Sequence, residues 1–310
     1  MRLGVTSLLT DRAMSPDQLA VEVEGRGFAS LFLPEHTHLP VRAADPPAIV
    51  EGVRPDDYRR SIDPFVGLAA AASVTRELRL GTGVCLVAQH DPVVLAKQVA
   101  TLDHLSGGRV DLGIGFGWNR AEAEDHGIAF GRRRAVAGEN VRCMQALWAD
   151  DVAEFHGALV DLAPCYSWPK PVQRAAPALP GRPGVPVLVG GGATPAVFDA
   201  VVGYGAGWMP IGGAGVAAAL PELTRRWEEA GRGNEPLRVV PFGTVPTVGK
   251  LAHFADLGID EVVLRLPSGP RDEMLPLLDE LAGHLARAGG VPPTAGPGDG
   301  PGGGVGGGRR

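Results

Sequence analysis

Residues 102–117 have the sequence Leu-Asp-His-Leu-Ser-Gly-Gly-Arg-Val-Asp-Leu-Gly-Ile-Gly-Phe-Gly, which predicts a helix end, a tight turn, a buried strand and a glycine-lined strand exit. Gly113, Gly115 and Gly117 alternate along one side of this strand. Because glycine leaves that face without side chains, a flat ligand can lie against the backbone there. The stretch therefore predicts a planar cofactor at the end of a barrel strand.

The composition limits the class of protein and of partner. A chain of 310 residues with 45% hydrophobic content can form one large α/β barrel or two ordinary domains. The net charge is −6 and no basic cluster is recognised in the folded part, so neither a nucleic acid nor a membrane surface is the expected partner. A small-molecule site is the favoured alternative.

The cysteines and the apolar segments indicate a cytoplasmic, soluble protein. Cys85, Cys143 and Cys165 stand far apart without a C-x-x-C spacing, which predicts a reducing compartment and neither a disulfide scaffold nor a metal knuckle. The chain shows neither a charged leader with a long apolar run nor a segment of about 18 uninterrupted apolar residues.

Short apolar runs alternate with amphipathic stretches, as in β-α units around a parallel sheet. Eight strands are predicted, at 3–6, 30–33, 78–85, 110–114, 185–189, 207–210, 237–240 and 261–264. Helices are predicted at 16–26, 64–75, 92–105, 134–149, 195–204, 216–230, 247–257 and 271–288. Four of these helices begin with proline after a residue that can cap a helix: Ser15, Asp63, Asp91 and Thr194. The pattern predicts a TIM (β/α)8 barrel over residues 1–288.

Three segments interrupt or follow this repeat. Residues 34–60 and 151–184 are long and rich in proline, and we expect both to fold over the open end of the barrel. Residues 289–310 are almost entirely glycine and proline, and we expect a disordered tail there.

The exit of the second strand carries Glu35, His36, Thr37 and His38. His36 and His38 can bind a metal together, but no later strand exit supplies the further histidine that such a site needs. A capping role is the structural alternative. We favour His36 as a hydrogen-bonding or catalytic residue.

The third and fourth strand exits are rich in glycine. Gly81 and Gly83 permit unusual peptide geometry beneath a ring system, or equally a tightly packed strand. Trp118 follows the glycines of the fourth strand, with Glu122 four residues later. A Rossmann dinucleotide site is not favoured, because these glycines follow a middle strand rather than the first.

The fifth strand leads into Gly190, Gly191 and Gly192 and then a helix. Free backbone amides at a helix N-terminus favour a phosphate, although a plain flexible loop is the alternative. Gly207 and Trp208 in the next unit can close the other side of that pocket. Together these exits predict a phosphorylated, flavin-like cofactor.

The chain resembles the bacterial-luciferase-like superfamily of flavin and deazaflavin oxidoreductases. The resemblance lies in residues 96–109, Ala-Lys-Gln-Val-Ala-Thr-Leu-Asp-His-Leu-Ser-Gly-Gly-Arg, and in the glycine strand after them. The motifs at 33–40, 63–65, 169–173 and 190–192 fall in the same order as in the deazaflavin-dependent branch. The resemblance covers about residues 1–288.

This resemblance implies a coenzyme at the mouth of the barrel, with its ring over a non-proline cis peptide, here Gly83–Val84. It implies that the Asp/Glu-His pair of the family corresponds to Glu35 and His36, that His36 lies near the ring, and that the 190–192 turn binds the phosphate. From its position, we expect Glu35 to orient or charge-balance His36. Gly115, Gly117, Gly207 and Trp208 are further expected cofactor contacts. Trp118 stands where some deazaflavin dehydrogenases have a glutamate, and we expect it to pack beside the ring.

We therefore predict an oxidoreductase that uses coenzyme F420 to transfer hydride to or from a small organic substrate, with His36, Glu35 and Trp118 at the reaction centre. No metal is expected, and the resemblance implies a homodimer. The alternatives are a two-component monooxygenase using FMN and oxygen, a barrel that binds flavin without turnover, and a metal-dependent hydrolase using His36 and His38.

Overall fold

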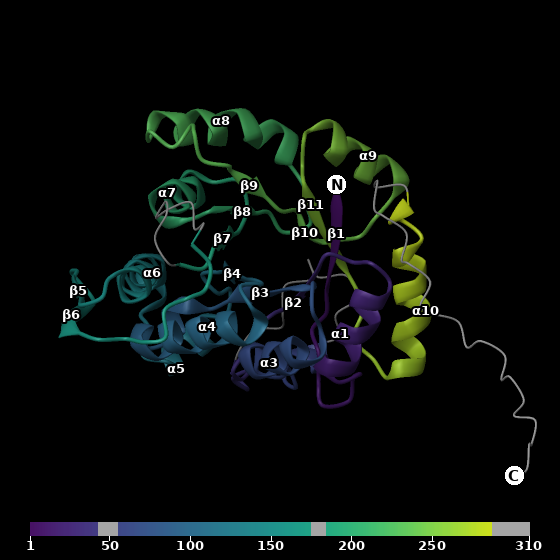
Figure 1. Cartoon of the computed structure of the whole chain (residues 1–310), viewed down its shortest axis with the longest axis horizontal. Coiled ribbons are helices and arrows are strands. Elements are labelled where there is room, and N and C mark those ends of the chain that lie inside the picture. The colour runs from purple at the N-terminus through teal and green to yellow at the C-terminus, as the bar shows by residue number, and fades with distance from the viewer. Residues whose placement is uncertain (43–54, 175–183, 287–310) are drawn as a thin grey trace, which may run out of the picture.

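The computed structural model describes residues 1–42, 55–174 and 184–286. Its centre is a curled sheet of nine parallel segments in the order β10-β11-β1-β2-β3-β4-β7-β8-β9, with helices packed outside it (Figure 1). The segments are β1 (Arg2–Thr6), β2 (Ser30–Leu33), β3 (Arg79–Cys85), β4 (Val110–Ile114), β7 (Val187–Gly190), β8 (Gly207–Met209), β9 (Arg238–Val239), β10 (Phe242–Thr244) and β11 (Glu261–Arg265). The predicted parallel sheet with outer helices is confirmed.

The two ends of this sheet are consecutive pieces of chain. β9 pairs with β8, and β10 pairs with β11. Only Val240 and Pro241 separate the two pieces; the Val240 amide donates to the Trp208 carbonyl oxygen, and the Pro241 carbonyl oxygen accepts from Val263, both at 2.9 Å. A single strand was predicted at 237–240. Pro241 has no amide hydrogen, so it interrupts the hydrogen-bond ladder between the two pieces.

The long helices lie where the apolar periodicity predicts them. They are α1 (Pro16–Gly25), α3 (Pro64–Val74), α4 (Pro92–Ser106), α6 (Arg133–Ala149), α7 (Pro195–Tyr204), α8 (Val216–Glu229), α9 (Val248–Asp256) and α10 (Arg271–Ala282). The side chains of Asp63, Asp91 and Thr194 accept amide hydrogen bonds as helix caps, as expected. The prediction for Ser15 is wrong in this respect, because its hydroxyl makes no cap hydrogen bond.

The interior of the sheet holds two kinds of layer. Phe32, Met209 and Phe242 belong to a buried apolar cluster inside the curl of the sheet. Nearer the amino ends of the strands, the fully buried Asp111 lies 2.8 Å from Arg79 and 2.5 Å from Arg238. Burial alone would raise the pKa of Asp111, but the two guanidinium groups hold it far below its usual value. The amino end is therefore closed by a charged, hydrogen-bonded plug.

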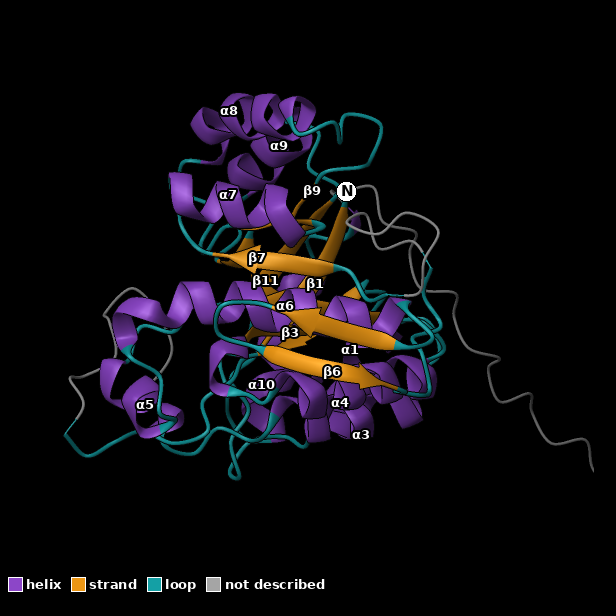
Figure 2. Ribbon diagram, turned by 90° about the vertical axis from the view of Figure 1, so that its left-hand side faces the viewer, coloured by secondary structure: helices purple, strands orange, loops and turns teal. Residues whose placement is uncertain are grey.

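The described part of 34–60, which includes α2 (Pro55–Tyr58), lies at the carboxyl ends of the strands, as predicted. For the described part of 151–184 the expectation is wrong. These residues include a hairpin of β5 (Ala153–His156) and β6 (Asp161–Cys165), which lies outside the sheet beyond α6 in Figure 1 and on the side that faces the viewer in Figure 2.

The segment after this hairpin, which includes Lys170 and Val172, lies at the amino end of the sheet, as its hydrogen bonds show. The Val172 amide donates to the Asp103 carboxylate near the end of α4, at 2.7 Å, and the Lys170 ammonium donates to the Leu147 carbonyl oxygen near the end of α6, at 2.9 Å. The physical reason is the order of elements. The segment follows a helix rather than a strand, and outer helices run back to the amino ends of parallel strands.

Three further predictions concern the cysteines, membrane-spanning segments and the C-terminal tail. Cys85, Cys143 and Cys165 are free thiols, as predicted. Among the described helices, none is long and apolar enough to cross a bilayer. The predicted tail at 289–310 lies outside the described residues.

Candidate active site at the carboxyl ends of the strands

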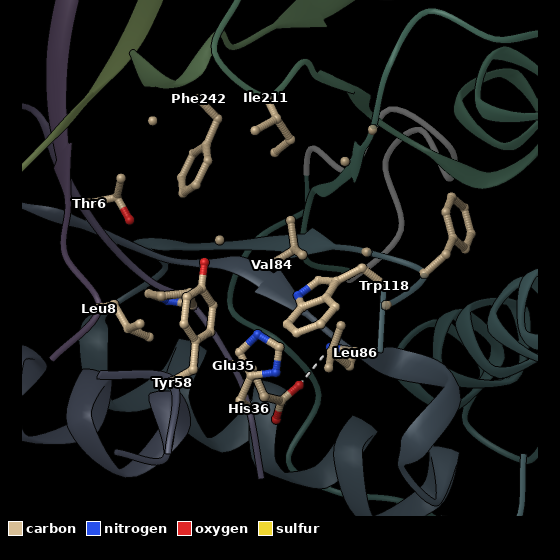
Figure 3. Close-up of a pocket in the computed structure, with 18 of the residues that line it drawn as sticks. Thr6, Leu8, Glu35, His36, Tyr58, Val84, Leu86, Trp118, Ile211 and Phe242 are labelled. Carbon is tan, nitrogen blue, oxygen red and sulfur yellow. Dashed lines mark hydrogen bonds between the residues drawn. The ribbon is translucent and has the colours of Figure 1, made fainter. Parts of the chain in front are cut away.

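A cavity of about 380 Å³ opens at the carboxyl ends of the strands (Figure 3). Strands β1, β2, β3, β4, β7, β10 and β11 or the loops after them all contribute to its wall, and Tyr58 and Asp57 of α2 contribute from the loop after β2. Nine of the predicted site residues line it: Glu35, His36, Gly83, Val84, Gly115, Gly117, Trp118, Gly190 and Gly191. The cavity is large enough for a substantial small-molecule ligand.

His36 stands in the wall of this cavity, held by a carboxylate. Its Nδ1 atom lies 3.0 and 3.2 Å from the two carboxylate oxygens of Glu122, whose side chain is completely buried. The imidazole meets Tyr58 and Trp118 edge to face, at centroid distances of 5.2 and 5.6 Å. With Nδ1–H donating to Glu122, the Nε2 atom is left for a molecule bound in the cavity.

Glu35 does not orient His36, and that expectation is wrong. One Glu35 oxygen accepts from the Leu86 amide at 2.6 Å, and the other lies 2.8 Å from His90 Nε2. Burial raises the pKa of Glu35, but the hydrogen bond and charge of His90 outweigh it, so the pKa lies below its usual value. Adjacent residues leave a strand in different directions, so Glu35 turns toward the exit of β3 while His36 turns toward α5 (Arg120–Asp125).

The floor of the cavity contains the cis peptide Gly83–Val84, as the resemblance implies. A Cβ atom on Gly115 would overlap the Val84 side chain, and one on Gly190 would lie 2.8 Å from Val84 Cγ1. The glycines of β4 were expected to expose backbone to a flat ligand. Gly115 instead makes room for Val84, and it is the isopropyl group of Val84 that a ligand above it would meet.

The turn after β7 contributes Gly190 and Gly191 to the cavity, while Gly192 lies outside its lining. Gly191 has a φ of 140°, which side chains rarely permit. Thr194 caps α7 directly behind this turn, accepting a hydrogen bond from the Val197 amide. The Gly191 amide donates to the Met209 carbonyl oxygen at 3.3 Å, so it is the amides that follow it, at Gly192 and Ala193, that can hold an anion.

Gly207 and Trp208 do not line the cavity, contrary to expectation. A Cβ atom on Gly207 would overlap the carbonyl group of Arg238 on the neighbouring strand. Trp208 is fully buried against Phe198 of α7, and its indole N–H donates to the Gly191 carbonyl oxygen at 2.9 Å. Trp208 therefore supports the glycine turn from behind, without reaching a ligand in the cavity.

The two histidines of the 36–38 motif have separate partners. His38 is half-exposed and its Nε2 atom lies 3.2 Å from the Asp125 carboxylate, whereas His36 is held by Glu122. This separation argues against a metal ion shared by His36 and His38. Within the described ranges, one group of three side chains has metal-ligand spacing: Glu35, Cys85 and His90. Glu35 and His90 of this group already pair with each other, at 2.8 Å.

The sequence analysis gives no role to several residues of the site, one of them behind the cavity wall and the others in its lining. Glu122 is one of these residues. Its position three residues after Asn119, whose side chain caps α5, is the sequence feature that could have drawn attention to it. The wall residue Tyr58 had no such signal. Arg133 and Arg134, at the start of α6, also line the cavity. They belong to the run Arg132–Arg134, a local cluster of positive charge in a chain whose net charge is −6.

A family model described as luciferase-like monooxygenase matches residues 12–249. The relative named Uncharacterized protein Rv0953c, from Mycobacterium tuberculosis (strain ATCC 25618 / H37Rv), is 39% identical over 289 residues, which cover 92% of this chain and 99% of the relative.

Two solved structures share the fold across most of the chain. Monooxygenase RslO1 from Streptomyces bottropensis has a TM-score of 0.71 at 22% identity, covering 93% of this chain and 99% of its own. An F420-dependent secondary alcohol dehydrogenase in complex with an F420-acetone adduct has a TM-score of 0.68 at 18% identity, covering 93% and 98%. At these identities the likeness shows a common fold and leaves the chemistry to the residues of the cavity.

Proposed function

The chain belongs to the luciferase-like monooxygenase family, and from that premise we propose that it is a coenzyme F420-dependent oxidoreductase that transfers hydride to or from a small organic substrate. The observation that carries the proposal is the position of His36, which faces the same cavity as the Gly83–Val84 floor and the 190–191 turn. The choice of deazaflavin rests on the motifs of residues 33–40 and 169–173.

The described residues fit a coenzyme with a flat ring and a phosphate. Val84 would support one face of a ring. The Gly191 amide donates to the Met209 carbonyl oxygen at 3.3 Å, so the amides that would hold the phosphate are those of Gly192 and Ala193, just before the capped helix α7. When bound, the deazaflavin supplies the carbon that gives or accepts the hydride.

The protein's own part in the reaction is to position the substrate and manage a proton. His36 Nε2 binds the oxygen of a substrate carbonyl or alcohol and donates or accepts the proton that accompanies hydride transfer. Glu122 stabilises the imidazolium that exists while His36 holds that proton. Trp118 and Tyr58 exclude water around the imidazole; burial raises the pKa of Tyr58, which keeps its hydroxyl protonated at neutral pH.

A binding titration tests the proposal. Purified protein is titrated separately with coenzyme F420 and with FMN, while tryptophan fluorescence is followed, since Trp118 lines the cavity. Micromolar binding with a preference for F420 supports the proposal. Preference for FMN, or binding of neither, contradicts it.

The second candidate is an FMN-dependent monooxygenase on the same barrel. The likeness to monooxygenase RslO1 over nearly the whole chain favours keeping it as an alternative. The two candidates differ in their need for oxygen, because a deazaflavin does not readily activate it. Product formation that requires oxygen would therefore identify the monooxygenase, and hydride transfer under anaerobic conditions would identify the F420 enzyme.

A further inference from the structure

Three arginines gather beside the cavity mouth, at the start of α6 and of α5. The Arg133 guanidinium lies over the Phe130 ring with its Cζ atom 3.7 Å from the ring centroid, and Arg120 approaches the same ring at 4.6 Å. Arg134 lies over the ring of Phe116, at 5.2 Å. Arg133 and Arg134 line the cavity, whereas Arg120 lies behind them.

None of the described residues neutralises the positive charge of the two lining arginines. Arg133 donates to the carbonyl oxygens of Gly117 and Phe130, at 3.2 and 2.7 Å, and both contacts fix its position without cancelling its charge. Within the part of the chain that the structure describes, no carboxylate pairs with Arg133 or Arg134. Burial and the neighbouring guanidinium groups lower the pKa of Arg133, as expected for cations held together. Guanidinium groups in this situation favour a carboxylate or phosphate ligand.

The arginines adjoin the end of the cavity that contains the glycine turn. Gly190 lies against Ile114 at the end of β4, and the chain runs directly from Ile114 to Gly117, which contacts Arg133. Arg133 and Arg134 therefore share the cavity lining with the glycine turn, and an anionic chain that continued beyond a phosphate held at that turn would have their guanidinium groups within the same cavity.

The two candidate coenzymes differ at this point. FMN ends at its phosphate, whereas F420 continues beyond it as a lactyl group and a chain of glutamates, each of which adds a carboxylate. We propose that Arg133 and Arg134 bind carboxylates of this glutamate tail and so select the deazaflavin over FMN. This inference rests on the proposed function and extends it to residues that no sequence motif identifies.

The test compares one variant with a control on the same helix. Arg134→Gln removes a lining charge from an exposed residue that donates no hydrogen bond to the other described residues. Arg142→Gln is the matched control: Arg142 lies further along α6, stacked 5.2 Å from the Tyr204 ring and outside the cavity lining. Dissociation constants are measured by calorimetry for F420 with its glutamate tail, for the deazaflavin riboside without phosphate or tail, and for FMN.

For wild type we expect tight binding of tailed F420 that weakens as salt is added, because the arginines are partly exposed to solvent. Arg134→Gln should weaken the binding of tailed F420 by about fivefold, an effect typical of a partly exposed ionic contact. The same variant should leave the binding of the riboside unchanged, and Arg142→Gln should leave the binding of both unchanged.

The remaining outcomes separate the inference from the proposed function. If wild type binds tailed F420 and Arg134→Gln binds it equally well, the inference is wrong and the proposed function stands. An equal loss for FMN and F420 would assign the arginine to the phosphate and overturn the tail assignment. If wild type binds neither form of the deazaflavin, both the proposed function and the inference fail.

Discussion

The Nδ1 atom of His36 lies 3.0 Å from Oε2 of Glu122, a carboxylate 86 residues further along the chain. Glu122 has no exposed surface, and its carboxylate accepts the Nδ1–H hydrogen bond of His36. The pair fixes the ring so that Nδ1 is its protein-facing atom, which makes Nε2 the atom available for chemistry.

We expect His36→Asn to lower kcat by a factor of about 10²–10⁴, the usual contribution of a general acid or base. The affinity for the coenzyme should change little, because the ring and the phosphate contact other residues. His38→Asn is the control, since His38 contacts Asp125 at the half-exposed rim, and it should keep wild-type turnover. Steady-state kinetics decide the matter; full activity of His36→Asn would remove His36 from the reaction.

Glu122 acts as a positioning residue, and we expect Glu122→Gln to lower kcat about tenfold while the dissociation constant of the coenzyme stays the same. The amide still accepts from Nδ1 but no longer stabilises a positive imidazole. Glu122→Asp should recover part of the rate, and Glu124→Gln, at an exposed position of α5, should have no effect. A loss of coenzyme affinity equal to the loss of rate would mean that Glu122 acts on binding instead.

We expect Gly115→Ala to destabilise the protein by about 1–3 kcal/mol, because the new methyl group overlaps the Val84 side chain. The second substitution Val84→Ala should recover part of that loss, since it removes the Cγ2 methyl group that overlaps the new Cβ atom. Urea unfolding of both single variants and of the double variant measures this coupling. Purely additive effects would contradict the contact between residues 84 and 115.

The pair of Glu35 and His90 should give stability that depends on pH. Burial alone would lower the pKa of His90, but the hydrogen bond and charge of Glu35 raise it. The folded protein therefore holds this proton more tightly than the unfolded chain. The resulting stabilisation is complete below the ordinary histidine pKa of 6.5 and is lost as pH rises through the raised value.

His90→Gln removes this charge, and we expect it to lower the free energy of unfolding by about 1–3 kcal/mol at pH 5.5. The difference from wild type should shrink as the pH is raised to 8.5, because His90 loses its proton as the pH rises through its raised pKa. Urea titrations at the two pH values provide the measurement, with His38→Gln as control. A difference that grows toward pH 8.5 would reverse the sign of the argument.

The fold was predictable because its signals are local. Proline after a capping residue begins α3, α4 and α7, and the apolar runs of β2 and β4 match the predicted ranges. The hairpin of β5 and β6 was not predicted, because its strands are half-exposed and carry no continuous apolar run. Its position also depends on where α6 ends, and this is a property of the barrel as a whole.

The sequence predicted which residues lie at the site better than it predicted which of them contact one another. Glu35 and His36 are neighbours in sequence, but the direction in which each side chain leaves β2 separates them. Gly115 was correctly placed in the cavity for the wrong reason, since it accommodates Val84. Glu122 could not be paired with His36 from spacing, because the partners meet only after three strands have assembled.

Trp208 lies directly behind the turn to which we assign the phosphate, where it can report on a ligand bound there. The indole N–H is fully buried on the dry side of the 190–192 turn and donates to the Gly191 carbonyl oxygen. A ligand that pulls on the amides of that turn polarises the same peptide groups, and the change reaches the indole through a single hydrogen bond. In an NMR spectrum, the Trp208 indole resonance should therefore report occupancy from a position that no ligand touches.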